Sequence, residues 1–248
     1  MLYMSKESFT AMSSEEKLMI LSRAHDWFGE NIAASHIERT KQLTSLDKFK
    51  INPFTVKYLA QFAFGNTEPE SLAKALLFPR VLGTSIATIV GDRLQKFCHE
   101  VLDGFASLTS GIDIEFEDRI DGRRKWCQLK AGPETLNKDD VQSITGHFKD
   151  IKGLARANKV QMNSDTDCVV GVMYGTKREL NSFYKQLDEQ FPVYVGSEFW
   201  TRLTGDTEFY EDLIQTFSRC ASDYSAESTL ADTIADLAAH IRTRSDGI

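Results

Sequence analysis

The sequence lacks the features of secreted and membrane-spanning proteins. No apolar run approaches the roughly 20 residues that a membrane-spanning helix needs. The first residues, MLYMSKESFTAMSSEEK, contain neither the basic region nor the apolar region of a secretory signal. We therefore expect a cytoplasmic protein without a membrane segment.

Cysteine is scarce, and its spacing excludes the common zinc and disulfide frameworks. The four cysteines, at positions 98, 127, 168 and 220, form no CxxC pair. The adjacent Cys98 and His99 have no second pair that would complete a tetrahedral zinc site. We therefore expect free, mostly buried thiols in a reducing compartment.

Positive charge is in deficit. The 29 lysines and arginines are outnumbered by 36 carboxylates, which gives a formal net charge of −7. This balance argues against a protein that coats nucleic acid nonspecifically, because phosphate binding needs positive potential. A specific DNA enzyme remains possible if its basic groups gather in one cleft.

The first hundred residues predict helices. Ser13 and Glu16 form a capping-box pattern before an apolar series at helical spacing, which predicts a long helix over residues 14–44 with a break near Gly29. Pro53 in the stretch INPF interrupts the pattern, because the residue before a proline disfavours the helical conformation. Further helices are expected over residues 55–64, 69–78 and 85–102.

The pattern then changes to that of a β-hairpin. Apolar and acidic residues alternate from Ile112 to Glu117, which predicts a strand with two distinct faces. The expected apolar face is Ile112, Ile114 and Phe116, and the expected acidic face is Asp113, Glu115 and Glu117. IDG at 120–122 predicts a tight turn, and RKWCQLKA at 124–131 predicts the returning strand. On that strand Trp126, Gln128 and Lys130 share one face.

The remaining sequence alternates helices and strands. Asn137 is the expected cap of a helix with a buried stripe, Val141, Ile144, Phe148, Ile151 and Ala155. The apolar run 167–175 predicts a strand covered on both faces, and FPVYVG predicts another. Ser197 is expected to cap the next helix, and two helices are expected over 207–243. The fold class is therefore α/β, with a central mixed β-sheet flanked by helices behind a helical N-terminal region.

The acidic face of the hairpin carries the residue types of a metal-dependent phosphodiesterase. Hydrolysis of a phosphodiester uses a divalent cation and a cationic group that stabilises developing charge. Mg²⁺ takes one or two carboxylates with other oxygens and waters. Asp113 and the amide oxygen of Gln128 are candidate ligands, Glu115 could supply further charge, and Lys130 faces the same side as Gln128.

This arrangement, an Asp followed by QLK on a hairpin, resembles the PD-(D/E)xK nuclease superfamily, in which Gln sometimes replaces the second acidic residue. A more specific resemblance covers roughly residues 50–205. It is to the type II restriction endonucleases that cut interrupted purine-GG-N-CC-pyrimidine palindromes. The stretches that carry it, in order, are INPF, PRVLG, DG with LKAG, VVGVMYG and VYVGSEFW.

The resemblance implies a homodimeric, Mg²⁺-dependent endonuclease that cuts double-stranded DNA. Asp113 matches the metal-binding Asp, Gln128 the second acidic position and Lys130 the catalytic Lys. The hairpin loop is slightly longer than the family pattern, so Glu115 is an alternative for part of the role of Asp113. Residues 1–105 would be a helical region for dimerisation or DNA contact. Residues 106–248 would form a restriction-endonuclease-like core with a helical tail, continuous with that region.

The segment after the hairpin is a candidate DNA contact. Thr135 and Asn137 could contact phosphates or base edges, and Lys138 could neutralise a phosphate. Helix capping explains the same residues equally well. His147, the one histidine near the site in the sequence, is interpreted as structural.

Three alternatives stay open from the sequence. The polar face of the hairpin could be plain solvent-exposed surface. The chain could be a non-catalytic DNA-binding or assembly protein that retains the nuclease fold, with Gln128 marking lost metal affinity. It could also be a repair or structure-specific nuclease.

Overall fold

The structure, a computed structural model, describes residues 11–102, 105–224 and 226–243. The chain divides into two compact units, each built from two separate segments. We call them the sheet unit, Met1–His25 with Arg93–Phe217, and the helical unit, Asp26–Asp92 with Ser218–Ile248. The boundaries of these units differ from the boundary at residue 105 that was expected from the sequence. The last helix belongs with early helices, because its apolar side chains join their core.

The sheet unit contains a four-stranded mixed sheet, which confirms the α/β class. Its strands are β1 (Ile114–Glu117), β2 (Arg124–Lys130), β3 (Cys168–Val172) and β4 (Val193–Val195), in that spatial order. β1 pairs antiparallel with β2, whereas the other two pairings are parallel. All five residues of β3 are buried, as expected of a strand covered on both faces.

The predicted hairpin is present. Gly122 has a φ of +68°, which favours glycine, and the Gly122 N–H donates to the Asp118 carbonyl at 2.8 Å. Ile114 and Phe116 are buried and Glu117 is exposed, as the alternation predicts. Ile112 differs from the prediction. It lies before β1 and joins the core that contains Trp126 and α7, whereas Phe116 packs edge-on against Phe199.

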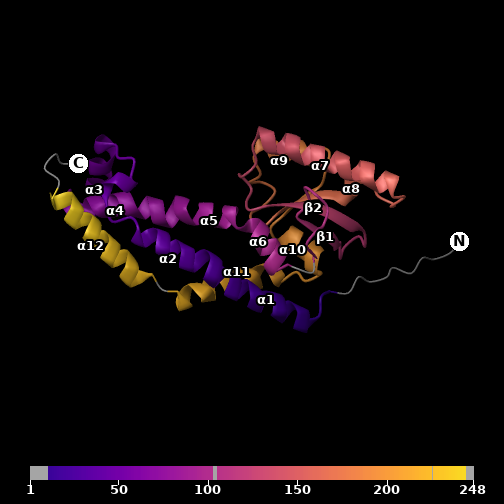
Figure 1. Cartoon of the computed structure of the whole chain (residues 1–248), viewed down its shortest axis with the longest axis horizontal. Coiled ribbons are helices and arrows are strands. Elements are labelled where there is room, and N and C mark those ends of the chain that lie inside the picture. Colours follow the sequence, from indigo (N-terminus) through magenta and orange to yellow (C-terminus); the bar gives the residue numbers. More distant parts are fainter. Residues whose placement is uncertain (1–10, 103–104, 225, 244–248) are drawn as a thin grey trace. The chain divides into compact units, whose positions relative to one another are not determined.

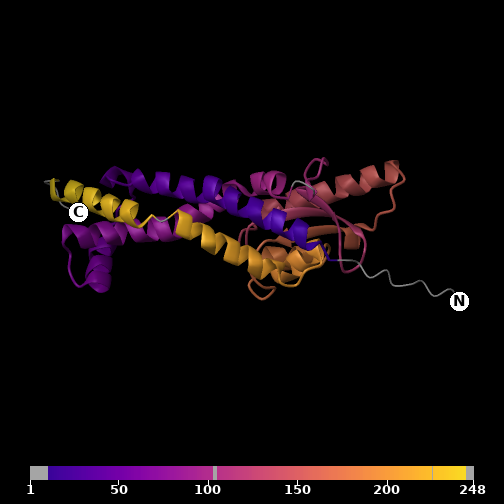
Figure 2. The same cartoon turned by 90° about the horizontal axis from the view of Figure 1, so that it is seen from below.

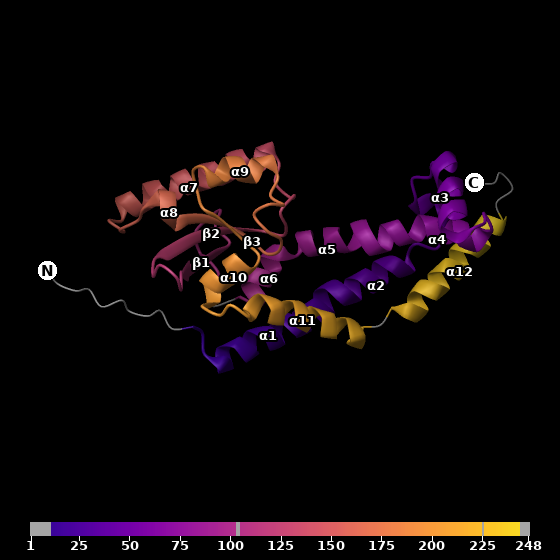
Figure 3. The same cartoon turned by 180° about the vertical axis from the view of Figure 1, so that it is seen from behind.

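Helices cover both faces of this sheet (Figures 1 and 3). The long α7 (Lys138–Ala157) and α9 (Ser182–Asp188) pack on one face, and the five apolar residues expected along α7 are all buried. On the other face, α10 (Ser197–Thr204) places Phe199 so close to Gly171 that a Cβ there would lie 2.6 Å from the ring. Gly196, rather than Ser197, occupies the N-cap of α10, which corrects the expected cap. The short α8 (Ser164–Asp167) precedes β3.

Three further helical segments contribute to the sheet unit. α1 (Ser14–Phe28) begins where the Ser13 hydroxyl accepts the Glu16 N–H at 3.1 Å, and only its first part lies in this unit. α6 (Leu94–Glu100) precedes the hairpin, and α11 (Phe209–Asp223) follows α10. Cys127, Cys168 and Cys220 are free and buried as expected; the side chain of Cys98 lies outside the described part.

The helical unit contains the remaining helices. Their bounds are η1 (Gly29–Ala33), α2 (Ala34–Lys41), η2 (Leu46–Lys48), α3 (Pro53–Phe64), α4 (Pro69–Pro79), η3 (Arg80–Ser85), α5 (Ile86–Asp92) and α12 (Glu227–Thr243). α12 lies along α4 and α2 (Figure 2). Leu237 and Ala238 of α12 share a core with Leu72 and Ala73 of α4. This packing joins residues that are far apart in the sequence.

Local sequence explains where α3 begins and where two of the helical runs switch to π-helical geometry. Asn52 caps α3 by accepting the Phe54 N–H at 3.0 Å, and Pro53 occupies the first turn. The expected break near Gly29 is the π-helical η1 rather than a gap. A second π-helical segment, η3, follows Pro79, which has no N–H to donate to the preceding turn.

The helical run Pro69–Asp92 corrects one expectation from the sequence. Within the described residues it is the single helix long and apolar enough to cross a membrane, by length and composition only. One such helix is weak evidence for a span. Leu72, Leu77 and Ile89 within the run are buried against protein.

Candidate active site

The hairpin brings Asp113 and Gln128 together. The β1–β2 register pairs Ile114 with Cys127, and one step further along it Asp113 faces Gln128. The Asp113 N–H donates to the Cys127 carbonyl at 3.1 Å, and the Leu129 N–H donates to Asp113 Oδ2 at 2.7 Å. The backbone N–H and one carboxylate oxygen of Asp113 are therefore both bonded to β2. The other carboxylate oxygen, Oδ1, is left as the one that can face a cation.

The carboxyl group of Asp113 is held in an environment that disfavours its charge. Burial raises the pKa of Asp113 above its ordinary value, although the Leu129 N–H and the nearby Lys130, His99 and His147 act to lower it. A buried acid whose charge is costly until a cation arrives is a common property of functional sites.

Gln128 is 7% exposed, and its amide is fixed by two acceptors. Its Nε2 donates to the Gly111 carbonyl and lies 2.7 Å from His147 Nδ1. A carbonyl can only accept, so the nitrogen of the amide must face Gly111, and Nδ1 of His147 must accept as well. These contacts use both amide protons, and the remaining atom, Oε1, is the one that can ligate a cation.

Lys130 lies two residues further on the same strand. Its Nζ donates to Asp140 Oδ1 at 2.9 Å, and the two side chains are 24% and 27% exposed. The bond from Lys130 is the main reason that the pKa of Asp140 is lowered, against the opposing effect of its burial. Lys130 thus lies partly exposed at the edge of the site, held by Asp140.

Glu115 also lies beside β2, but its oxygens already have partners. Oε1 accepts the hydroxyls of Ser107 at 2.5 Å and Thr109 at 2.9 Å, and Oε2 accepts from Arg124. Burial acts to raise the pKa of Glu115, but the hydrogen bonds from Ser107, Arg124 and Thr109 outweigh it, so the pKa is lowered. This arrangement favours Asp113 over Glu115 as the ligand.

The three candidate DNA contacts lie just after the hairpin. The Thr135 hydroxyl donates to the Gly132 carbonyl at 2.8 Å, and Asn137 Oδ1 accepts the N–H groups of Asp139 and Asp140 in a capping box. Lys138 is exposed in the first turn of α7. Thr135 and Asn137 therefore have structural roles in shaping this segment, and Lys138 is the residue best placed to meet a ligand.

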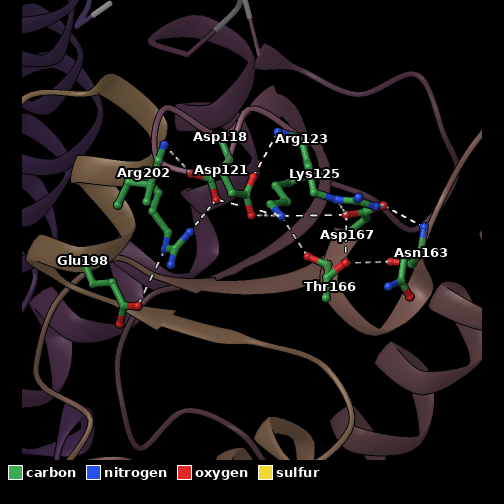
Figure 4. A network of polar contacts seen from close by, with 10 residues as sticks. Asp118, Asp121, Arg123, Lys125, Asn163, Thr166, Asp167, Glu198 and Arg202 are labelled. Carbon is green, nitrogen blue, oxygen red and sulfur yellow. Dashed lines mark hydrogen bonds and ion pairs between the residues drawn. The ribbon is translucent and has the colours of Figure 1, made fainter. Parts of the chain in front are cut away.

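A buried ion-pair network anchors the turn of the hairpin (Figure 4). The fully buried Nζ of Lys125 lies 2.6 Å from Asp121, 4.0 Å from Asp118 and 3.8 Å from Asp167, and it donates to the Thr166 carbonyl at 2.9 Å. Figure 4 also shows Arg123 bonded to Asp167 and Arg202 bonded to Asp118. The network joins the turn to α8 and α10, which fixes β2 and the residues it carries.

Two residues of the site were not found from the sequence. Asp140 was not among the candidate residues, and His147 was interpreted as structural, yet they contact Lys130 and Gln128. A signal existed for both, because Asp140 and His147 are seven residues apart and so lie on one helix face.

The candidate ligands suit Mg²⁺ only if the protein supplies few of its ligands. Across the described part of the chain, no group of three or more His, Cys, Asp or Glu side chains could hold a metal ion. Mg²⁺, however, takes one or two carboxylates and completes its shell with waters and substrate phosphate. Asp113 Oδ1 and Gln128 Oε1 fit that requirement.

Comparison with known proteins decides the family. The sequence model described as "Type II restriction endonuclease EcoO109I" matches residues 23–224, which is most of the chain. The chain belongs to the EcoO109I family of type II restriction endonucleases. No curated relative matches it.

The EcoO109I family match includes every residue of the candidate site, from Asp113 to His147. It also extends through the early helices and into α11, which is wider than the similarity noted from the sequence motifs. The helices that precede the hairpin within residues 23–224 are therefore part of the sequence pattern of this family and not an unrelated addition.

Proposed function

We propose that this member of the EcoO109I family is a Mg²⁺-dependent PD-(D/E)xK endonuclease that hydrolyses phosphodiester bonds in double-stranded DNA. The observation that carries the proposal is the attachment of Asp113 to Cys127 and Leu129, on either side of Gln128, on a strand that also carries Lys130. The family match supports DNA cleavage in general. The metal and the roles of these residues are our inference.

Asp113 Oδ1 and Gln128 Oε1 would hold Mg²⁺. When bound, Mg²⁺ lowers the pKa of a coordinated water and neutralises charge on the scissile phosphate. Lys130 would orient the attacking water and stabilise the negative charge that develops on phosphorus-bound oxygens. Asp140 positions the Lys130 ammonium, and His147 with the Gly111 carbonyl positions the Gln128 amide.

The target is proposed to be an interrupted purine-GG-N-CC-pyrimidine palindrome, on the strength of the sequence motifs. Lys138 would neutralise a backbone phosphate near the site, and Thr135 and Asn137 would shape the segment that approaches the DNA. We also propose that the enzyme acts in the cytoplasm.

A homodimer is proposed because a two-fold protein is the simplest reader of a two-fold site. The exposed side chains of α3 support this. Phe54, Tyr58 and Phe62 recur every four residues and are 88%, 63% and 75% exposed, and the last two rings stack at 5.9 Å. Such an apolar stripe typically marks a protein–protein contact.

The decisive experiment is cleavage of plasmid DNA with and without Mg²⁺, using the parent protein, Lys130→Ala and Lys149→Ala. Lys149 is an exposed lysine of α7 outside the site and serves as the matched control. Discrete fragments from the parent and the control, lost in Lys130→Ala, support the proposal. Intact plasmid in all three, with DNA still bound, would instead favour the non-catalytic binding protein, for which Gln128 is the motivating observation. Cleavage only of branched substrates would favour a repair nuclease.

A further inference from the structure

A basic cavity lies in the helical unit, apart from the residues of the candidate active site. It has a volume of about 360 Å³ and is lined by eight residues. Three of them are cationic, Arg39, Lys48 and Arg80. The others are Gln42, Leu43, Thr84, Ser85 and Thr88. No carboxylate belongs to this lining in the described structure, although the chain as a whole carries an excess of seven negative charges.

The three cations come from three separate elements. Arg39 lies in the last turn of α2, Lys48 ends η2, and Arg80 begins η3. Charges that approach from different elements repel one another, and the repulsion is removed only by an anion or by water and salt. Their convergence on one cavity is therefore better explained by a ligand than by the requirements of the fold.

The acidic neighbours of these cations are weak competitors. Asp92 lies 4.0 Å from Arg39, and Asp47 lies 3.6 Å from Lys48, with all four side chains between 46% and 68% exposed. Exposed pairs of this kind contribute little free energy. The cations remain available to a stronger anion.

The rim of the cavity is held in helical geometry. The Thr88 hydroxyl donates to the Thr84 carbonyl at 2.8 Å, and the Thr84 hydroxyl donates to the Arg80 carbonyl at 3.4 Å. The charged donors that remain for an anion are the two guanidinium groups and the ammonium, and the Gln42 amide and the Ser85 hydroxyl also line the cavity. Guanidinium forks match the oxygens of phosphate in two-point hydrogen bonding.

We propose that this cavity, defined by Arg39, Lys48 and Arg80, binds a phosphate group. The group could come from the backbone of duplex DNA or from free inorganic phosphate, and the chemistry of recognition is the same. The site is separate from the proposed cleavage residues and stands whether or not those residues cleave DNA.

The test compares the parent protein with Arg39→Gln/Arg80→Gln. In the presence of Ca²⁺, binding of a labelled duplex is measured over a range of salt concentrations. Each backbone contact adds about 0.9 to the slope of log affinity against log salt. We expect the double variant to lose about one to two from the magnitude of that slope, equally on duplexes of different sequence. Lys57→Gln, an exposed lysine of α3 outside the cavity, is the matched control and should keep the parent slope.

A second arm uses inorganic phosphate alone and follows thermal unfolding. Stabilisation of the parent and the control by phosphate, lost in the double variant, would show that the cavity binds free phosphate. If this occurs while the DNA slope is unchanged, the source is free phosphate and not the DNA backbone. An unchanged DNA slope together with no phosphate effect on the parent would overturn the proposal. Circular dichroism of each variant verifies that the exposed substitutions leave the fold intact.

Discussion

The amide nitrogen of Gln128 lies 2.7 Å from Nδ1 of His147. This contact, together with the Gly111 carbonyl, determines the orientation of the amide and leaves Oε1 as its unbonded end. The neutral glutamine thus presents an oxygen in a fixed direction, which is the oxygen that the proposed function assigns to Mg²⁺.

Asp113→Asn should abolish cleavage and leave DNA binding largely intact, because the variant loses the carboxylate oxygen proposed for Mg²⁺. Retained cleavage would transfer that role to Glu115.

The Asp113→Asn variant should also be more stable than the parent at neutral pH, by about 1 kcal/mol. The pKa of Asp113 is raised in the folded protein, so its stabilising contribution exists at low pH and is lost as pH rises through that pKa. Thermal denaturation without metal at several pH values should show the gap widening with pH. Asp140→Asn is the control of opposite sign, because the pKa of Asp140 is lowered and its removal should destabilise the fold at neutral pH.

Gln128→Glu should strengthen Mg²⁺ binding because it adds a charge at a ligand position. It should also destabilise the metal-free protein by about 1–3 kcal/mol, because a carboxylate oxygen would face the Gly111 carbonyl. Thermal denaturation in EDTA and in Mg²⁺ measures both effects, since a ligand that binds only the folded state raises its stability. The deficit in EDTA should shrink as Mg²⁺ is added. A variant that binds Mg²⁺ more weakly than the parent would remove Gln128 from the ligand set.

His147→Phe should weaken metal binding about tenfold or more, because partners that orient a metal ligand typically contribute that much. Phenylalanine fills the same space under Gly111 but cannot accept the Gln128 amide proton. Direct titration with Mn²⁺, monitored by its paramagnetic resonance, reports binding independently of cleavage. His147→Gln restores an acceptor and should recover much of the affinity. Equal metal binding by the parent and the phenylalanine variant would show that His147 serves packing alone.

Lys125→Met should destabilise the sheet unit by about 3–5 kcal/mol, because it leaves the fully buried Asp118 and nearly buried Asp167 without their shared ammonium. Urea denaturation measures the change. Lys149→Met, an exposed substitution, should change stability by no more than about 0.5 kcal/mol. A loss of similar size in both variants would show that the network contributes little.

Phe54→Ser/Phe62→Ser should shift the proposed dimer towards monomer, because it removes two of the most exposed aromatic rings of the helical unit. Sedimentation velocity over a range of protein concentrations measures the change. Leu108→Ser, at a fully exposed leucine of the sheet unit, is the control and should keep the parent distribution. An unchanged dimer in the double variant would place the interface elsewhere.

The sequence predicted most local elements because their signals are local. The alternation around Ile114, the turn glycine Gly122 and the apolar stripe of α7 each determine their own structure. The two-unit division could not be predicted in this way. It depends on the packing of α12 against α4, which brings together residues more than 150 positions apart. No local sequence pattern predicts such a pairing.

In the candidate site, too, the local features could be predicted from the sequence and the long-range contacts could not. Gln128 and Lys130 could be assigned to one strand face from their spacing, and extending the β1–β2 register by one residue beyond Ile114 and Cys127 puts Asp113 opposite Gln128. The partners Asp140 and His147 were not predicted, since they come from α7 and meet the strand only after the helix packs on the sheet. The two-residue alternation of strands gives no information on which helix covers them.

The ion pair between Lys130 and Asp140 has a consequence for selectivity. Without a substrate, the ammonium that would assist hydrolysis already donates to a carboxylate of the same molecule. Under the proposed function, an arriving DNA phosphate would share the ammonium with that carboxylate, because a lysine ammonium has three N–H donors and Asp140 accepts one of them. The carboxylate would then hold the ammonium in one direction while its remaining donors face the DNA, so a DNA strand bound out of register would meet a lysine that cannot turn to follow it.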